Sequence, residues 1–340
     1  AGLVFPHDRS KSSADQTVIS PGFEAAYLLD GHGSGAPLDK ADLDRALGQD
    51  ATLWVHLGRD APGARAWLQD ESGLDPLVVE ALLAENTRPR AVAMGNGAML
   101  FMRGVNLNPG ADPDDMVSIR LWVEARRVIS VRLRRLHSVD DIRQALESGR
   151  GPIDAGDFVV YLAGRLISRM AEVITDVNDE VDELQEEVLA GESAQLRTRL
   201  TRLRGKMISL RRHLAPQRDA LIRLTQLSLP WLGGGELGRL REEADRVTRY
   251  VEDLDAARDR ADLTHEELAS RMAEQLNARM YLLSVVAAFF LPLSFLTGLL
   301  GINVGGIPLS DNQWGFAAVA LILLLLIVLQ VLLFRWRRWL

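Results

Sequence analysis

Two long apolar runs near the C-terminus constrain this chain more than any other feature. Met280–Leu300 and Phe316–Phe334 each hold about 20 residues, and a helix of about 20 residues crosses a hydrocarbon core about 30 Å thick. Between Met280 and Phe334 the single formally charged side chain is Asp311. Soluble folds seldom need two such runs joined by one short loop, so we predict a membrane-spanning helical hairpin.

The charges around these runs predict their orientation. The linker 301–315 contains no Lys or Arg, whereas Arg271 and Arg279 precede the first run and the tail 335–340 holds three arginines. The positive-inside rule therefore places both termini in the cytoplasm and the linker outside. Interfacial anchors are expected at Trp314, Trp336 and Trp339.

Composition excludes several classes of function. The chain has 39 basic and 46 acidic residues, a net charge of −7, which argues against a nucleic-acid binder. It has no cysteine, which excludes disulfide scaffolds, thiolate zinc sites and iron–sulfur clusters. Nucleotide-binding glycine motifs, a nucleophile elbow and a zinc-protease helix are absent, so we expect neither a cofactor nor an enzyme.

The polar part of the chain divides by pattern. Up to residue 150, short runs rich in branched and aromatic residues alternate with helical segments, which predicts an α+β domain. These runs are 52–57, 98–105, 116–123 and 127–133, with helices at 62–69 and 75–84. From Asp157 an acidic helix with one apolar stripe precedes a basic helix, and we predict that the two pair as an antiparallel hairpin.

A third helix is expected from Arg239 into the first membrane run, about 60 residues and near 90 Å long, with a kink at Pro292. Its heptad seam is broken by Arg258 and His265. The expected division is an N-terminal domain, a helical hairpin, a stalk helix, two membrane spans with a linker between them, and a basic tail. Their bounds are 1–150, 151–235, 236–279, 280–300, 301–315, 316–334 and 335–340.

The first membrane run has one side rich in small and polar residues. This stripe comprises Asn277, Ser284, Ala287, Ser294 and Gly298, with Met280, Leu283 and Leu291 on or beside it. A polar side facing lipid is costly, so it should face water in a pore or a neighbouring helix. Periodicity alone leaves both open, and a pore needs a symmetric ring of copies. Further back, Asp259 and Glu266 continue the stripe, either as an acidic vestibule or as a solvated face.

At the end of the first run stands Gly301-Ile302-Asn303, followed by Val304-Gly305-Gly306-Ile307-Pro308. Two C-terminal spans, a long stalk helix and this motif resemble the CorA superfamily of divalent-cation transporters. Ile302 replaces the methionine that most members carry, which is similar to the ZntB zinc-transporter branch. The resemblance implies a funnel-shaped homopentamer in the bacterial inner membrane, with an α/β domain, long stalk helices and a ring of membrane helices.

The resemblance also implies residue roles. Asn303 would meet a hydrated cation at the outer mouth, and Gly301 would allow the tight turn there. Six residues match positions that line the pore in this family: Asn277, Met280, Leu283, Leu291, Ser294 and Gly298. Ser284 and Ala287 of the stripe complete the expected pore lining. The implied cargo is Zn²⁺, and the implied partners are further copies of the chain, the lipid bilayer and divalent cations. Magnesium members carry an acidic outer loop, whereas Asp311 is the only acid here, which favours zinc.

The leading hypothesis is therefore passive or proton-coupled zinc uptake. A magnesium or cobalt/nickel channel of the same superfamily is one alternative, and a non-conducting, membrane-anchored coiled-coil scaffold is another. A membrane-bound enzyme is the third. The candidate titratable cluster for proton coupling is His265 beside Glu266 and Glu267, and the carboxylates of the acidic helix are candidate sites for a regulatory cation.

Overall fold

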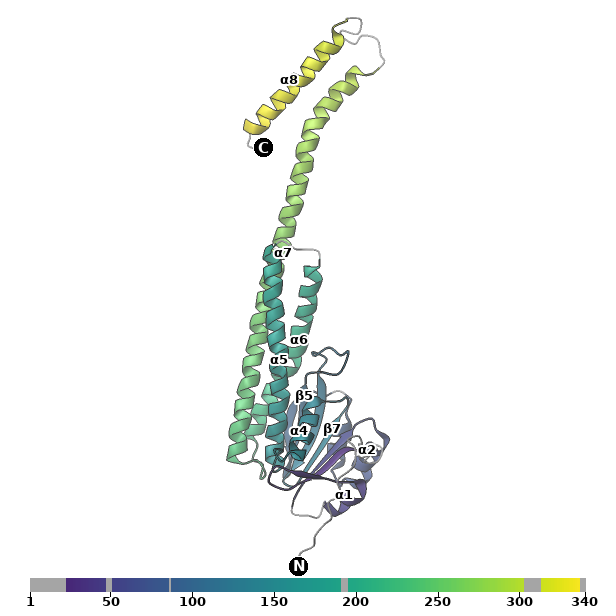
Figure 1. The fold of residues 1–340 in the computed structure, drawn as a ribbon, viewed down its shortest axis with the longest axis vertical. Helices are drawn as coiled ribbons and strands as arrows, with labels where there is room; N and C mark the ends of the chain where they lie inside the picture. Colours follow the sequence, from purple (N-terminus) through teal and green to yellow (C-terminus); the bar gives the residue numbers. More distant parts are fainter. Residues whose placement is uncertain (1–22, 47–50, 86, 191–194, 303–312, 337–340) are drawn as a thin grey trace, which may run out of the picture. The chain divides into compact units, whose positions relative to one another are not determined.

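The computed structural model describes residues 23–46, 51–85, 87–190, 195–302 and 313–336 (Figure 1). It separates into two compact units, 1–264 and 265–340. The first unit contains a sheet and a helical bundle, and the second contains two apolar helices. Helix α7, Gly234–Leu300, belongs to both units.

A seven-stranded mixed sheet forms the centre of the first unit. The strands lie in the order β2-β1-β3-β7-β6-β5-β4, and every pair is antiparallel except β3 with β7. Their bounds are β1 Phe23–Leu29, β2 Gly35–Pro37, β3 Thr52–Gly58, β4 Arg90–Met94, β5 Gly97–Gly104, β6 Val117–Glu124 and β7 Arg127–Arg132. The predicted mixed α/β domain is confirmed, and the sheet also contains β1, β2 and β4, which were not predicted.

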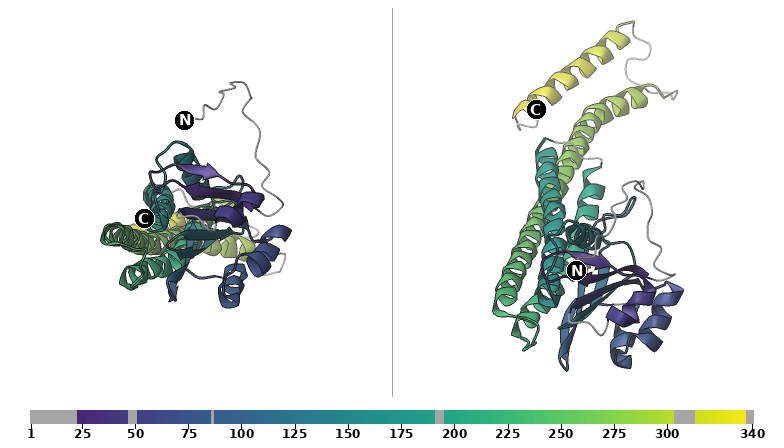
Figure 2. Two further views of the ribbon diagram at one scale, coloured as in Figure 1. Left: turned by 90° about the horizontal axis from the view of Figure 1, so that it is seen from below. Right: turned by 60° about the horizontal axis from the view of Figure 1, so that its bottom comes forward.

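Helices cover both faces of this sheet (Figure 2). One face packs against short helices around Trp67, Val78 and Phe101. These are α1 Lys40–Ala46, α2 Pro62–Ala66, the π-turn η1 Trp67–Glu71 and α3 Pro76–Leu83. The other face meets long helices, with the Trp54 ring of β3 5.0 Å from Phe158 of α5. Cover on both faces explains why every residue of β3 and β6 except the last of each strand is buried, including the polar His56, Ser118 and Arg120.

The long helices of the first unit form a bundle with charged pairing between them. They are α5 Ala155–Ala190, α6 Leu196–Gln226 and the first part of α7, with α4 His137–Glu147 beside α5. Arg199 of α6 lies 2.7 Å from Glu187 and 3.0 Å from Glu183 of α5, so the predicted acidic–basic hairpin is confirmed. Arg260 of α7 hydrogen-bonds Asn178 of α5 at 2.6 Å.

The predicted seam of α7 is wrong at Arg258 and His265, whereas Ala261 and Leu268 are buried as predicted. Arg258 is exposed and His265 is half-buried, whereas Ala257 and Thr264 are buried. The buried positions advance from Leu254 by three and then four residues, so the seam is continuous and contains no charged residue, and Thr264 is its one polar member among Leu254–Leu268. After Leu254 the buried face advances by three residues to Ala257, where a regular heptad alternation would advance by four to Arg258.

The second unit contains two helices that are long and apolar enough to span a membrane, α7 and α8 Gly315–Trp336. Within this unit α7 bends in its apolar part, where Pro292 lies inside the helix (Figure 1). Helix α8 packs beside it, with the rings of Phe289 and Phe334 stacked 5.4 Å apart at 16°. The predicted helical hairpin is therefore present.

Candidate functional site

The candidate site is the stripe along the apolar part of α7. All its members are exposed in a single chain, and the largest side chains expose 64% (Met280), 66% (Leu283) and 74% (Leu291) of their surface. The remaining members are Asn277, Ser284, Ala287, Ser294 and Gly298. Nothing in the described part of one copy covers this side of the helix.

The opposite side of α7 packs against α8. The half-buried residues of the span are Val285, Phe289, Pro292, Leu293, Leu296 and Leu300. With 3.6 residues per turn, the centre of this set lies about 180° around the helix from the centre of the stripe. Helix α8 therefore covers the side of α7 that faces away from the stripe, which leaves the stripe free for water or for further copies.

Two hydroxyl groups on or near the stripe, those of Ser284 and Thr297, are satisfied within the helix. Ser284 donates from Oγ to the Met280 carbonyl at 2.9 Å, and Thr297 donates to the Leu293 carbonyl at 3.0 Å. A serine bonded in this way pays little for facing lipid, so Ser284 alone does not demand water. The exposed Asn277 indicates a polar environment more clearly, because its amide offers two donors and an acceptor.

The described helix ends at the expected mouth motif. The Gly301 N–H donates to the Thr297 carbonyl at 3.0 Å, and a Cβ atom at Gly301 would lie 3.0 Å from the same carbonyl oxygen. Glycine therefore permits a close approach of the chain to its own last turn. Ile302 is 47% exposed. Asn303 and Asp311 lie outside the described residues.

The proposed acidic positions are exposed but do not form a metal centre. Asp259 and Glu266 both lie on the surface of a single copy. Glu267 pairs with Arg271 at 2.6 Å, so part of the predicted titratable cluster around His265 is engaged elsewhere. Within the described ranges, no three His, Asp or Glu side chains are placed to hold a metal ion together.

A buried polar network in the sheet was not predicted from sequence. His56 Nδ1 lies 2.8 Å from Ser130 Oγ, and its Nε2 lies 3.4 Å from Glu24 Oε2, while Arg132 also bonds Glu24. Burial lowers the pKa of His56, against the opposing effect of Glu24. Serine, histidine and glutamate also occur together in hydrolases. Here His56 is 1% exposed and Ser130 is fully buried, so no substrate reaches them.

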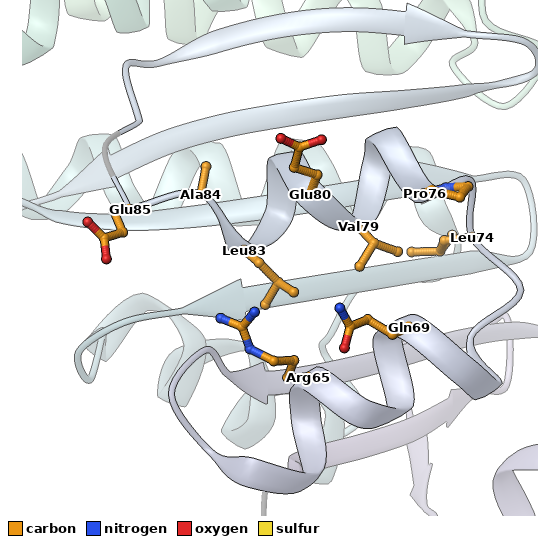
Figure 3. Close-up of a pocket in the computed structure, with 9 residues that line it drawn as sticks. All are labelled: Arg65, Gln69, Leu74, Pro76, Val79, Glu80, Leu83, Ala84 and Glu85. Atoms are coloured by element: carbon orange, nitrogen blue, oxygen red, sulfur yellow. The ribbon is translucent and has the colours of Figure 1, made fainter.

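A cavity of about 540 Å³ lies in the first unit between α2–η1 and α3 (Figure 3). Arg65 and Gln69 point from one side toward the apolar side chains of Val79 and Leu83 on the other. Its lining holds no Ser, Thr, Cys or His side chain, so it offers no hydroxyl, thiol or imidazole group for nucleophilic catalysis. The sequence carried no motif that marked it.

The chain is similar to known proteins over most of its length. Residues 49–338 match the family model described as CorA-like Mg²⁺ transporter protein. The chain belongs to this family. The predicted superfamily is therefore confirmed.

Relatives match nearly the full length. The divalent cation transporter CmaX of Pseudomonas aeruginosa is 43% identical over 92% of this chain and 96% of its own. The zinc transport protein ZntB of Yersinia enterocolitica is 35% identical over 89% of this chain and 91% of its own. The solved structure of full-length CmaX covers 96% of this chain and all of its own, with a TM-score of 0.83 at 40% identity.

These relatives are transporters rather than enzymes, and together with the two apolar helices they make this chain a membrane protein of the CorA type. The CorA magnesium transporter of Methanocaldococcus jannaschii shares the fold at a TM-score of 0.77, with 17% identity, over 91% of this chain and 97% of its own.

Proposed function

We propose that this protein conducts divalent cations, with zinc as the main cargo, across the bacterial inner membrane through the centre of a funnel-shaped homopentamer. The observation that carries the proposal is the uncovered stripe of α7, which lies opposite the side that α8 covers. The names of the two relatives, a divalent cation transporter and a zinc transport protein, indicate the cargo.

The stripe would become the pore wall once copies assemble in a ring. One helical hairpin cannot enclose water, whereas rotational symmetry repeats each stripe residue around an axis. Met280, Leu283 and Leu291 would then form an apolar constriction. Asn277, Ser284 and Ser294 would provide weak oxygen ligands beside the small Ala287 and Gly298. Weak ligands suit conduction, because a permeating ion must also leave.

The mouth of the pore would be formed by Gly301, Ile302 and Asn303. An asparagine amide from each copy would offer oxygen to a cation that keeps part of its hydration shell. At the cytoplasmic end, rings of Asp259 and Glu266 would raise the local concentration of cations. Absence of cysteine from the chain fits this loose ligation better than a tetrahedral zinc site.

The flanking charges support cytoplasmic termini and a periplasmic linker at 301–315. With the division expected above, residues 1–279 would form the cytoplasmic funnel, and 280–300 and 316–334 the spans. An inside-negative potential favours cation entry by about 2.3 kcal/mol per charge per 100 mV, so the proposed direction is uptake.

The decisive experiment is zinc flux into liposomes that hold the purified protein and a zinc-sensitive dye. We expect Asn303→Ala to reduce the initial rate at least about tenfold, the scale of one lost amide contact worth about 1.4 kcal/mol per copy. Asn312→Ala makes the same chemical change in the same linker and should leave the rate intact. An undiminished rate in Asn303→Ala would remove this residue from the mechanism, and a rate insensitive to a pH gradient would argue against proton coupling.

Magnesium transport is the second candidate, because the matching family model carries that description. The same liposomes loaded with a magnesium-sensitive dye separate the two. Faster magnesium than zinc uptake under equal gradients would favour the magnesium candidate. Absence of flux for every divalent cation, with detergent particles that show no ring of copies, would favour the scaffold instead.

A further inference from the structure

The bend of α7 leaves a backbone carbonyl without its usual donor. In an α-helix the N–H of each residue donates to the carbonyl four residues earlier, and proline has no N–H. Pro292 lies inside α7, so the carbonyl of Ala288 loses that bond. In the hydrocarbon region no water replaces it, and an unsatisfied carbonyl there is strongly unfavourable.

A side chain of α8 meets this carbonyl. Gln330 Nε2 donates to the Ala288 oxygen across 3.4 Å, a long hydrogen bond between the two helices. Gln330 is the one strongly polar residue in the run Phe316–Phe334. The glutamine therefore lies opposite the single position of this stretch where proline has removed an intrahelical donor.

The other half of the same amide shows what the glutamine costs. Gln330 Oε1 is buried and has no hydrogen-bond partner among the described residues. Burying an amide oxygen without a hydrogen-bond donor is unfavourable, and a leucine at this position would avoid that cost. This cost is offset if the amide nitrogen of Gln330 donates a hydrogen bond to the Ala288 carbonyl, which Pro292 leaves without a donor.

A second contact holds the two helices in the same register. Phe334 lies four residues, or one turn, after Gln330, and its ring stacks on Phe289, the neighbour of Ala288. The ring pair and the hydrogen bond thus form adjacent contacts on one side of the bend. The stripe residues Leu291, Ser294 and Gly298 lie beyond or beside this point, on the opposite face of α7.

We propose that Gln330 is a positioning residue, which fixes the bend of the pore-lining helix by satisfying the Ala288 carbonyl that Pro292 leaves free. Without this bond the Ala288 carbonyl has no fixed donor, and the segment of α7 after Pro292 adopts more than one orientation. The structural statement stands by itself, and its consequence for ion passage rests on the proposed transport function.

A double-mutant cycle on the full chain in detergent tests the coupling. Gln330→Leu removes the donor, and Pro292→Ala restores the N–H, which makes the donor dispensable. We expect Gln330→Leu to lower Tm by about 2–4 °C in the parent protein. In the Pro292→Ala background the same change should lower Tm by less than half as much. Leu329→Met, at an exposed neighbour of Gln330, is the control and should leave Tm unchanged in both backgrounds.

Equal shifts in the two backgrounds overturn the proposal, because Gln330 then acts independently of the proline. An unchanged or raised Tm for Gln330→Leu in the parent protein also overturns it. If Pro292→Ala yields no folded protein, Pro292→Leu supplies the same N–H and takes its place in the cycle.

Zinc flux in liposomes separates a positioning role from a general loss of stability, because only a positioning role makes the effect of Gln330→Leu on flux depend on Pro292. We expect Gln330→Leu to reduce the initial rate several-fold in the parent and to have little effect in the Pro292→Ala background. If the parent protein transports no divalent cation, the proposed function is contradicted. The double-mutant cycle measured by Tm still tests the structural role of Gln330. Non-additive Tm values with additive flux would confine Gln330 to stability and overturn its positioning role.

Discussion

Acid sensitivity of the first unit can be traced to His213 on α6. This half-buried imidazole faces the positive side chains of Arg103, Arg212 and Arg88, with Asp115 as the opposing acid. Burial, and then the repulsion of these arginines, lowers the pKa of His213 to about 4. We predict that His213→Gln makes the folded protein less sensitive to acid.

The direction of this pH effect on stability follows from proton binding in the folded and unfolded states. Since the pKa of His213 is lower in the folded state, the unfolded chain binds a proton first as the pH falls below about 6.5. The stabilisation is complete above pH 6.5 and is lost progressively as the pH falls toward 4. From pH 7 to pH 5 one such group would cost about 2 kcal/mol. Solvent screening of a half-exposed side chain reduces this to about 1 kcal/mol.

Thermal unfolding of the full chain in detergent at pH 7 and pH 5 measures the effect. Between these pH values, Tm should fall about 2–4 °C further for the parent than for His213→Gln. The same replacement at His32, an exposed histidine in a turn, controls for the loss of a histidine as such. If the parent and His213→Gln lose the same number of degrees, the arginine cluster does not hold the imidazole neutral, and the reasoning is refuted.

Two further predictions concern the first unit, each checked by unfolding in detergent. Leu254→Ala opens a cavity in the corrected seam of α7 and should lower the unfolding free energy by about 2–5 kcal/mol, whereas Leu263→Ala, on the exposed side, should change it by less than about 1 kcal/mol. Arg120→Met removes a fully buried guanidinium whose Nε and Nη1 have no partner among the described residues, so stability should stay unchanged or rise by about 1 kcal/mol. A loss above about 2 kcal/mol for Arg120→Met would show a stabilising partner for that charge.

The long-period patterns were the parts of this protein that sequence could predict. The apolar face predicted for the acidic helix, from Val159 to Val188, is buried as a face of α5. This prediction was reliable because helical periodicity over many turns averages out local exceptions. The same averaging explains the error at Arg258, where a one-residue change of step moved the seam to Ala257 and Thr264. Short strands such as β2 at Gly35–Pro37 carry too few residues for any periodicity, so the edge of the sheet was missed.

Some features of the candidate site were predictable from sequence and others were not. The side of α7 that packs on α8 emerged only from the structure, yet it lies opposite the stripe predicted from small and polar residues. The hydrogen bond that satisfies Ser284 could not be inferred, because a serine in an apolar helix looks the same whether its donor is used internally or not. His56 and Ser130 meet from strands 74 residues apart, and no local pattern signals such a pairing.

The parallel pairing of β3 with β7 affects how the first unit folds during synthesis. Leu53 of β3 lies beside Arg127 of β7, and the intervening chain must leave the ribosome before that edge of β3 is paired. Until then the segment TLWVHL presents an open apolar strand, the kind of edge that recruits other chains. Chaperone protection of nascent chains should therefore be needed most between the emergence of β3 and the emergence of β7.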